Sequence, residues 1–520
     1  MTSTTLRRLA AVSAGFALAV SGLGTSPASA DPSPAGGSAA GWITGKLVNG
    51  QLFPEGFNNG FNIDAGLAEL AMGNTAAVGQ IRDALAGSIN DYIAFEPDDP
   101  GSTYAGPTAK ALSFVVRSGG DPTSFGGVNL VSRLEATVSS APATAGRIAD
   151  ISTFGDFANT IGQSFATQGL AAVNSPKAAS VRAFLLKQQC PDGEFRLAFS
   201  DPADPQQGCI TNPAAPTGPD VTAYAVLGLQ DQYADPMVKA AVDKAVAWLR
   251  SIQAADGSFT DEDSKPNSNS TGLAGAALGQ SCAVDAATRA AAWIRGVQVP
   301  PGQTGPLAGD VGAVAFGPAE LAAAQSAGIT DLQQWKVSTA QATPTLAWDP
   351  AAPATVQVKP PSKFVKGGSH VRVSITGVAK GERVCVSDST GGSAALTGTG
   401  AALSYEVTTA RKGGDVTVTA TTGPGKATGT VKVLGKARLK PKLAKTVHRG
   451  HRAAVTVKKL GAKEKVRLYV DGRLVARGKA NKKGVFKGGF AAKLKVGKHK
   501  LKVVGQFKNR TGTAAFRVVG

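Results

Sequence analysis

The sequence predicts a multidomain chain in which an all-α domain of about six helix pairs is followed by two all-β sandwiches. Residues 39 to 345 alternate between small-residue apolar helical stretches and more charged ones, the pattern of two concentric rings of helices. From about residue 354, apolar and polar residues alternate between Gly-rich turns, which is typical of antiparallel strands. The charge also changes sign, because residues 31 to 353 hold 17 Lys and Arg against 30 Asp and Glu, whereas residues 436 to 520 hold 26 against 2. A chain of 520 residues is long enough for several domains.

The first 30 residues have the pattern of an export signal. Arg7 and Arg8 precede an apolar run over residues 9 to 23, and Ala28-Ser29-Ala30 offers a small-residue cleavage site. The run contains Ser and Gly and is shorter than the roughly 20 apolar residues of a spanning helix. We therefore expect a secreted, extracellular protein, free or held at the cell wall by non-covalent contacts, whose mature chain starts with a Pro/Gly/Ser linker at residues 31 to 38.

A short phrase recurs in the helical part. In residues 184 to 195 and 248 to 259, an aromatic residue is followed five positions later by Gln, and then by Asp-Gly-x-Phe. A third copy begins at Trp293 and keeps Gln298, but prolines replace the turn. A weaker match to the same pattern starts at Gly41. The aromatic residue can pack its helix on a neighbour, the glutamine can bond backbone, and the glycine permits a tight turn. The phrase therefore predicts a unit that closes each helix pair onto the next.

Six stretches with Ala- and Gly-rich faces are expected to form the inner ring, because small side chains let helices approach closely. These stretches begin at Asn62, Tyr104, Phe157, Asp220, Asn269 and Gly309.

The strand-rich part divides into two blocks, residues 354 to 435 and 436 to 520, joined to the helical domain by a linker at 346 to 353. A shift of 82 residues aligns Gly368 with Gly450 and Glu382 with Glu464. We therefore expect two related β-sandwiches.

The repeated phrase resembles the QW-type repeat of the α/α-toroid superfamily, which includes squalene and terpene cyclases, protein prenyltransferase β-subunits and transcobalamin-type carriers. The resemblance covers residues 39 to 345, with Phe184 where the cyclases prefer Trp. It implies a toroid with a central hole, and it is the only reason to consider cobalamin, since no residue here predicts a cofactor. The two strand blocks resemble bacterial immunoglobulin-like domains.

The catalytic signatures of that superfamily are missing from the sequence. Cyclases protonate an alkene with the central Asp of a DxDD run, and the nearest stretches here are DEDS at residues 261 to 264 and PDDP at residues 97 to 100, both loop-like. The run Asp261-Glu262-Asp263 is either an acid cluster at the mouth of the cavity or a solvated turn, and we favour the turn because like charges are usually exposed. There is no DDxxD run and no Gly-Cys-Gly-Glu-Gln thioester phrase. A prenyltransferase-like zinc site needs a histidine in the helical part, but all four lie in the strand-rich part: His370, His448, His451 and His499.

We therefore predict no catalytic residue and no metal ligand, and favour a binding protein over an enzyme. The alternative is a terpene or squalene-cyclase-type enzyme with an atypical acid.

Five side chains are candidates for a ligand site at the mouth of the toroid, because parallel inner helices would bring their N-terminal ends together. They are Asp64, Tyr104, Asp220, Tyr224 and Asp310. The alternative is that the three aspartates cap helix N-termini and the two tyrosines belong to the core.

The four cysteines suit an oxidising compartment. Cys190 and Cys209 flank one irregular loop, so we predict a disulfide between them. Cys282 is either a buried thiol or the partner of Cys385 in the strand-rich part.

The last block carries its positive charge on the polar side of its strands. In KLKVGKHKLKVV, lysines 493, 495, 498, 500 and 502 are expected to face outward, with Leu494, Val496, Leu501 and Val503 in the core. The positive charge of this block favours an anionic partner. We expect that partner to be a cell-envelope polymer or, within the chain, the acidic toroid. Nucleic acid is disfavoured, because the aromatic residues read as core positions: Tyr469, Phe486, Phe490, Phe507 and Phe516.

Overall fold

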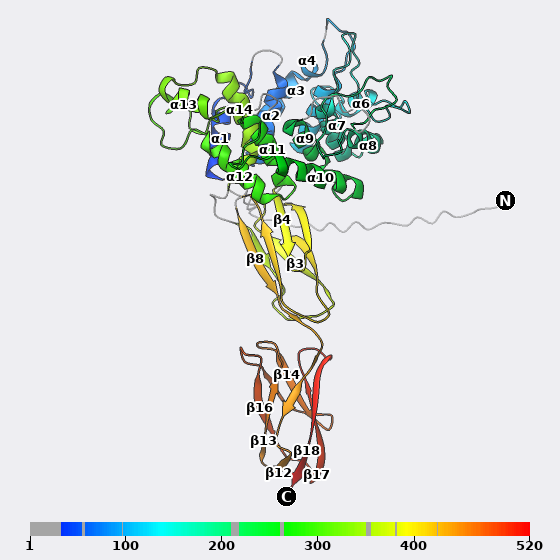
Figure 1. Ribbon diagram of the computed structural model, residues 1–520, viewed down its shortest axis with the longest axis vertical. Helices are drawn as coiled ribbons and strands as arrows, with labels where there is room; N and C mark the ends of the chain where they lie inside the picture. The colour runs from blue at the N-terminus through cyan, green and yellow to red at the C-terminus, as the bar shows by residue number, and fades with distance from the viewer. Residues whose placement is uncertain are drawn as a thin grey trace, which may run out of the picture.

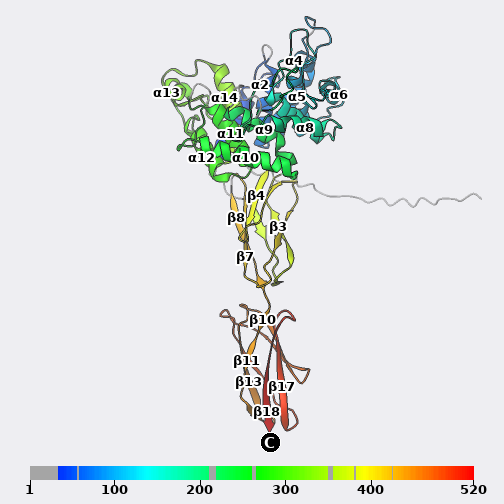
Figure 2. The same ribbon diagram turned by 45° about the vertical axis from the view of Figure 1, so that its right-hand side comes forward.

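The computed structural model describes residues 33–54, 58–95, 97–209, 218–260, 265–349, 355–379, 382–423 and 425–520. The expected signal peptide and the DEDS stretch at 261 to 264 lie outside these residues. A helical domain is followed by two β domains, one below the other, with the C-terminus at the far end of the second (Figure 1 and Figure 2). This is the fold class that the sequence predicts.

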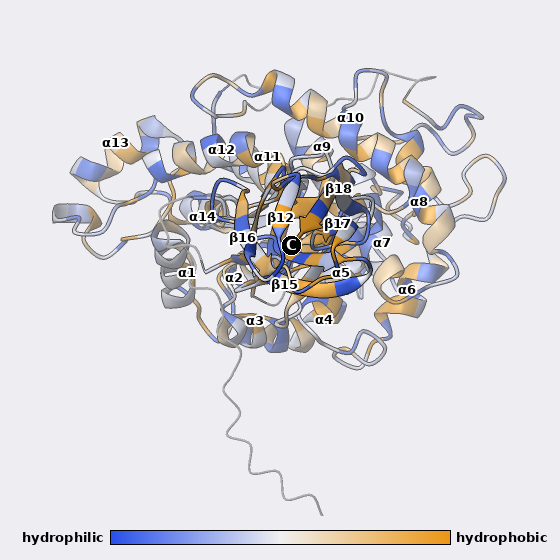
Figure 3. Cartoon of the chain, turned by 90° about the horizontal axis from the view of Figure 1, so that it is seen from below, coloured by the Kyte–Doolittle hydropathy of each residue, from blue (hydrophilic) through white to orange (hydrophobic). Residues whose placement is uncertain are grey.

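Six inner helices form a closed ring, in which each helix packs on the next and the last packs on the first. In order, they are α2 (Asn59–Ala71), α5 (Ala105–Arg117), α7 (Thr160–Ala172), α9 (Pro219–Leu229), α11 (Ser268–Gln280) and α14 (Leu332–Leu346). Seen along the long axis, they surround the line on which the β domains lie, and the outer helices surround them in turn (Figure 3).

The outer ring supplies one helix to each pair. Its members are α1 (Pro34–Gly45), α3 (Thr75–Gly87), α6 (Leu130–Ala136), α8 (Ala178–Lys187), α10 (Pro236–Ile252) and α12 (Val284–Gly296). Shorter elements fill the connections: α4 (Ile89–Ile93), η1 (Gln230–Gln232), η2 (Gly305–Leu307) and α13 (Pro318–Ala327). Helix α1 begins within the expected linker at 31 to 38, because the Ser33 hydroxyl accepts a bond from Gly36 N and proline occupies the first helical position.

The sequence prediction is wrong for the sixth inner helix. The stretch from Gly309 is a loop, in which Gly312 adopts a φ of +98°, and it leads to α13 at the periphery (Figure 3). The inner position belongs to α14 instead. That helix buries polar residues such as Lys336 and Thr343, so its hydropathy does not mark it as a core helix.

Small residues set the spacing of the inner ring. A Cβ at Gly272 of α11 would lie 2.5 Å from Ala342 Cα of α14, and one at Gly162 of α7 would lie 2.9 Å from Gly106 Cα of α5. The Ala- and Gly-rich faces are therefore needed for the close packing of these helices.

The repeated phrase joins each helix pair to the next, as predicted. Gln253 Nε2 donates to the carbonyl of Gly257 in its own turn and to that of Ala286 in α12, both at 3.0 Å. Gln189 Nε2 bonds Gly193 O at 2.9 Å and Ala241 O of α10 at 2.8 Å in the same way.

The third copy of the motif, in which prolines replace the turn, makes the same two bonds, but its glycine lies farther along the chain. Gln298 Nε2 donates to Gly312 O and to Ala35 O of α1, both at 3.0 Å. This pair of bonds ties the last repeat to the first and so closes the outer ring.

The first β domain has a three-stranded sheet β1-β3-β6, a four-stranded sheet β5-β4-β7-β8 and a short pair β2-β9. Its strands are β1 (Gln357–Lys359), β2 (Val365–Lys366), β3 (His370–Thr376), β4 (Arg383–Asp388), β5 (Ser393–Thr397), β6 (Leu403–Thr408), β7 (Val416–Thr421), β8 (Lys426–Val431) and β9 (Val433–Leu434).

The second β domain pairs a sheet β11-β13-β16 with a larger one in the order β10-β18-β17-β14-β15, to which β12 adds. Its strands are β10 (Ala437–Arg438), β11 (Lys440–Lys442), β12 (Thr446–His448), β13 (Arg452–Lys458), β14 (Lys465–Val470), β15 (Arg473–Lys479), β16 (Phe486–Ala491), β17 (Gly497–Val504) and β18 (Arg510–Val519).

The two β domains share local features at the 82-residue shift. Gly368 and Gly450 turn with φ values of +83° and +82°. Glu382 accepts a 2.7 Å bond from Ala379 N, and Glu464 accepts a 2.6 Å bond from Gly461 N.

The alternation in the second β domain is as predicted except at one end. The five lysines of KLKVGKHKLKVV are exposed, and Leu501 and Val503 are buried. Val496, however, is 57% exposed, because it lies in the turn before Gly497, whose φ is +145°. Leu494 is half-buried. Of the five aromatic residues, Phe486, Phe490 and Phe516 are buried, and the other two are half-buried.

Two disulfides are present. Cys190 and Cys209, 19 residues apart, are bonded as predicted. Cys282 bonds Cys385, so a covalent link joins the helical domain to strand β4. Within the described ranges, no helix has the length and apolar character needed to cross a membrane.

We predict that Gly257→Ala destabilises the helical domain more than Gly302→Ala. Gly257 has a φ of +97°, and a Cβ there would lie 2.4 Å from Arg289 O, whereas Gly302 has a φ of +79° with no atom within 4 Å. Both variants bear the backbone penalty of roughly 1 kcal/mol, and only the first adds an overpacking penalty of about 1–3 kcal/mol. Urea unfolding followed by far-UV circular dichroism measures the difference, and equal losses would contradict this account of the turn.

Candidate functional site

The first β domain is seated on the end of the toroid at which the inner helices terminate. Arg383 Nε of β4 donates a 2.9 Å bond to the carbonyl of Gln280, the last residue of α11, and the disulfide of Cys282 lies two residues further on. A guanidinium at a helix C-terminus meets the negative end of the helix dipole. Gly423 approaches so closely that a Cβ there would overlap Ala347 O. This interface is thus held by a hydrogen bond from the Arg383 guanidinium, by a disulfide and by close packing at Gly423.

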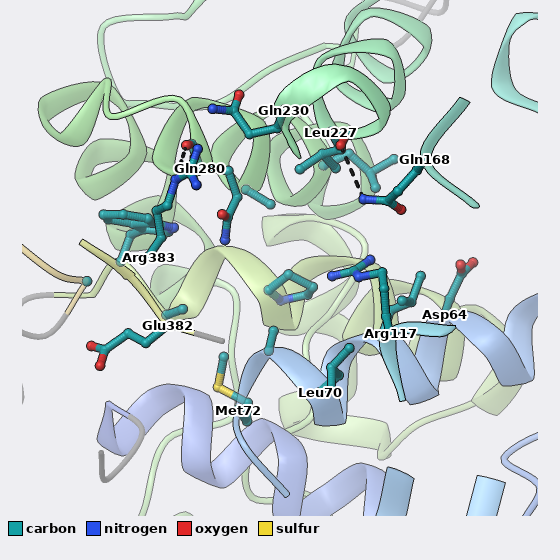
Figure 4. Close-up of a pocket in the computed structure, with 18 of the residues that line it drawn as sticks. Asp64, Leu70, Met72, Arg117, Gln168, Leu227, Gln230, Gln280, Glu382 and Arg383 are labelled. Carbon is teal, nitrogen blue, oxygen red and sulfur yellow. Dashed lines mark hydrogen bonds between the residues drawn. The ribbon is translucent and has the colours of Figure 1, made fainter. Parts of the chain in front are cut away.

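A cavity of about 450 Å³ lies between the two domains. The C-terminal halves of the inner helices form its wall, and residues of the first β domain, including Glu382 and Arg383, form its other side (Figure 4). Much of the wall is apolar, with Leu70, Leu227 and Leu273 among its residues. A volume of this size is typical of small-molecule sites, which fall roughly between 300 and 1,000 Å³.

The cavity is at the opposite end from the one expected. The expected mouth lies at the N-terminal ends of the inner helices, whereas the cavity is bounded by their C-terminal halves. The order of the elements explains the position of the cavity, because α14 ends at Leu346 and the first β domain follows it at that end.

Asp64 lines the cavity as an ion-paired residue. It is the sixth residue of α2 and only 5% exposed, so it is not an N-cap. Its Oδ1 lies 2.6 Å from Lys110 Nζ, and its Oδ2 accepts a 3.1 Å bond from Gln341 Nε2. Both oxygens of the Asp64 carboxyl group are therefore engaged by side chains of the protein.

Tyr224 lines the cavity beside Asp64. Its ring packs against that of Phe165, with centroids 5.4 Å apart. Burial, helped by the nearby carboxylates of Asp64 and Asp220, raises the pKa of Tyr224 well above its usual value. The phenol therefore stays protonated and can donate a hydrogen bond.

The other three predicted site residues are not brought to the cavity. Tyr104 precedes α5, and its hydroxyl lies 3.3 Å from Ser152 Oγ. Asp220 is in the first turn of α9. Asp310 lies against α1, where it accepts a 3.0 Å bond from Trp42 Nε1 and pairs with Lys46 Nζ at 2.9 Å.

In α7, α11 and α14, the side-chain N-cap comes from a residue other than the candidates. Asn159, Asn267 and Asp331 accept bonds from backbone N–H groups in the first turns of α7, α11 and α14. The alternative that the candidate aspartates act as N-caps is therefore wrong for Asp64 and Asp310.

Sequence reasoning missed several polar residues of the cavity. Arg117 ends α5, and Gln168, Gln280 and Gln341 lie on the inner helices α7, α11 and α14. The signal in the sequence is the presence of polar residues in the C-terminal halves of otherwise apolar helices.

Asp99 of the PDDP stretch has a structural role. It accepts bonds from Ser152 Oγ at 2.6 Å and Thr153 Oγ1 at 2.8 Å. These bonds hold the pKa of the carboxyl below its usual value, so Asp99 is ionised and unsuited to protonate an alkene. Across the described part of the chain, no group of three or more His, Cys, Asp or Glu side chains is arranged to hold a metal ion.

Comparisons with known proteins give similarity to solved structures alone. No family model matches the chain. No curated protein matches it. A crystal structure of a protein from Actinoplanes aligns over 60% of this chain and 98% of its own, with 17% identity and a TM-score of 0.41. The type II terpene cyclase MstE from Scytonema aligns over 60% and 96%, with 14% identity and a TM-score of 0.40. The Yersinia pseudotuberculosis adhesin InvE aligns over 32% and 59%, with 11% identity and a TM-score of 0.19. At these values the likeness assigns no activity to this chain.

We predict that loss of the Cys282–Cys385 disulfide loosens the cover of the cavity. In a Cys282→Ser/Cys385→Ser variant, amide hydrogen exchange of Ser281 and Trp348 is expected to be faster by roughly tenfold or more, because the interface then opens by local fluctuation. The control is Cys190→Ser/Cys209→Ser, which removes a disulfide within the helical domain and leaves those two amides protected. Unchanged exchange in the first variant would show that the disulfide does not hold the interface.

Proposed function

We propose that this chain is a secreted, non-enzymatic binding protein. Its toroid, covered by the first β domain, holds a small ligand, and its second β domain attaches the protein to an anionic cell-surface polymer. The observation that carries this proposal is the segregation of charge, with 26 Lys and Arg against 2 Asp and Glu over residues 436 to 520.

Both acidic residues of the second β domain are engaged locally. Glu464 is fully buried and pairs with the buried Arg510, Nε to Oε1, at 2.7 Å. Asp471 lies 2.6 Å from His499 Nδ1 and accepts a bond from Lys500 N. The outside of the domain is therefore a nearly uncompensated cationic surface, which an anionic polymer would screen.

Other features support the remaining parts of the proposal. Two disulfides are compatible with an oxidising, extracellular setting. A cavity bounded by two domains is a common form of small-molecule site. Asp99 is fixed in a loop and its pKa lies below the usual value, so it does not supply the protonated carboxylic acid that cyclisation of an alkene requires.

We predict that the purified mature protein does not cyclise squalene or geranylgeranyl substrates. Gas chromatography of extracts after prolonged incubation is expected to return unreacted substrate. A cyclised product formed by the wild type and lost in Asp261→Asn or Asp263→Asn would establish the cyclase alternative in place of the binding function.

We predict that the full chain binds phosphocellulose and is released steeply as salt rises from about 0.05 to 0.5 M, because binding displaces counterions. A chain ending at residue 435 should not be retained. Replacing Lys493, Lys498 and Lys502 by Gln should move elution to lower salt.

The matched control replaces Lys187, Lys239 and Lys244, three exposed lysines of the helical domain, and should elute as the wild type does. Equal shifts in the two triple variants, or retention that salt does not affect, would contradict attachment through the second β domain.

A further inference from the structure

Among the cationic groups that line the cavity, Arg117 differs from Arg383. Arg383 is held by Gln280 O through Nε and by Thr397 Oγ1 through Nη1. Arg117 forms no hydrogen bond or ion pair with any residue that the structure describes. In Figure 4 its guanidinium points toward the middle of the group of lining side chains.

The side chain of Arg117 is exposed and borders the cavity. Partial desolvation by the surrounding protein lowers the pKa of its guanidinium. Asp231 attracts it through space without forming an ion pair, and that carboxylate is approached by Gln168 Nε2 at 3.5 Å. A guanidinium held in such a place has five N–H donors suited to a planar or tetrahedral anion.

The remaining carboxylates of the lining do not compete for Arg117. Asp64 is paired with Lys110 at 2.6 Å. Glu382 accepts a bond from Ala379 N, and its burial raises the pKa of its carboxyl, which favours the neutral form. The rest of the nearby wall is largely apolar, with Leu67, Leu70 and Leu227 among its residues.

We infer that the cavity takes an amphipathic anion, whose carboxylate or phosphate group is bound by Arg117 and whose apolar body packs on the leucines of the inner helices. This inference rests on the proposed ligand-holding function and adds the chemical class of the ligand. Arg117 supplies the charge, and the inner helices and the first β domain exclude water from the apolar part.

Isothermal titration calorimetry of the full mature chain with decanoate, decyl phosphate and decanol tests the inference. Decanol carries the same apolar chain without the anion, and the two anions distinguish a carboxylate from a phosphate ligand. The wild type is expected to bind one molecule of at least one anion, at least tenfold more tightly than decanol. Arg117→Met should reduce that preference to within about twofold of decanol and leave decanol binding unchanged, while Arg117→Lys should retain part of it.

Two further variants locate the site. Arg250→Met, on the outer helix α10, should bind as the wild type does. Leu227→Trp, which places a bulkier side chain in the apolar wall, should weaken the binding of all three probes. Anions bound no better than decanol, or a preference that survives in Arg117→Met, would overturn the assigned ligand class while leaving a ligand-holding cavity in place. If none of the three probes binds the wild type, both the ligand class and the ligand-holding part of the proposed function fail.

Discussion

The helical domain depends on one interaction that recurs around the ring, in which a glutamine amide donates to two backbone carbonyls. One carbonyl belongs to the glycine of a nearby turn and the other to an adjoining outer helix, as at Gln253 and Gln298. Gln163, on an inner helix, makes the same kind of pair with Gly146 and Val181. Because both acceptors are backbone groups, the contact fixes the main chain itself, and a side chain that cannot donate twice would leave a carbonyl unsatisfied. The inner helices can then pack closely through small residues such as Gly162 and Gly272.

The position of the cavity follows from the direction of the chain. All inner helices end on the face where α14 delivers the chain to the first β domain, so that domain covers their C-terminal ends. Arg383 satisfies the carbonyl of Gln280, and the Cys282–Cys385 disulfide makes the contact covalent. The first β domain therefore closes the cavity and also contributes residues to its lining, so that both domains form the site.

Much of the fold was predictable because its signals are local. Five of the six inner helices and the Cys190–Cys209 disulfide follow from periodicity and spacing within short segments. Helix α14 was missed because its core position is occupied by hydrogen-bonded polar residues, and Thr339 and Thr343 bond carbonyls one turn earlier. The site was largely unpredictable for a different reason. Whether a charged residue such as Asp64 or Arg117 has a partner depends on Lys110 and on the seating of the β domain, and neither is visible in a single sequence.

We propose that the covered cavity is a ligand site and not a packing void. Native mass spectrometry of the full chain, purified from culture medium without refolding and then incubated with decanoate and decyl phosphate, distinguishes the two. We expect one additional small molecule per chain, held non-covalently and released on unfolding, and less of this adduct on a Leu227→Trp chain. A wild-type chain that shows only its bare mass under these conditions would contradict it.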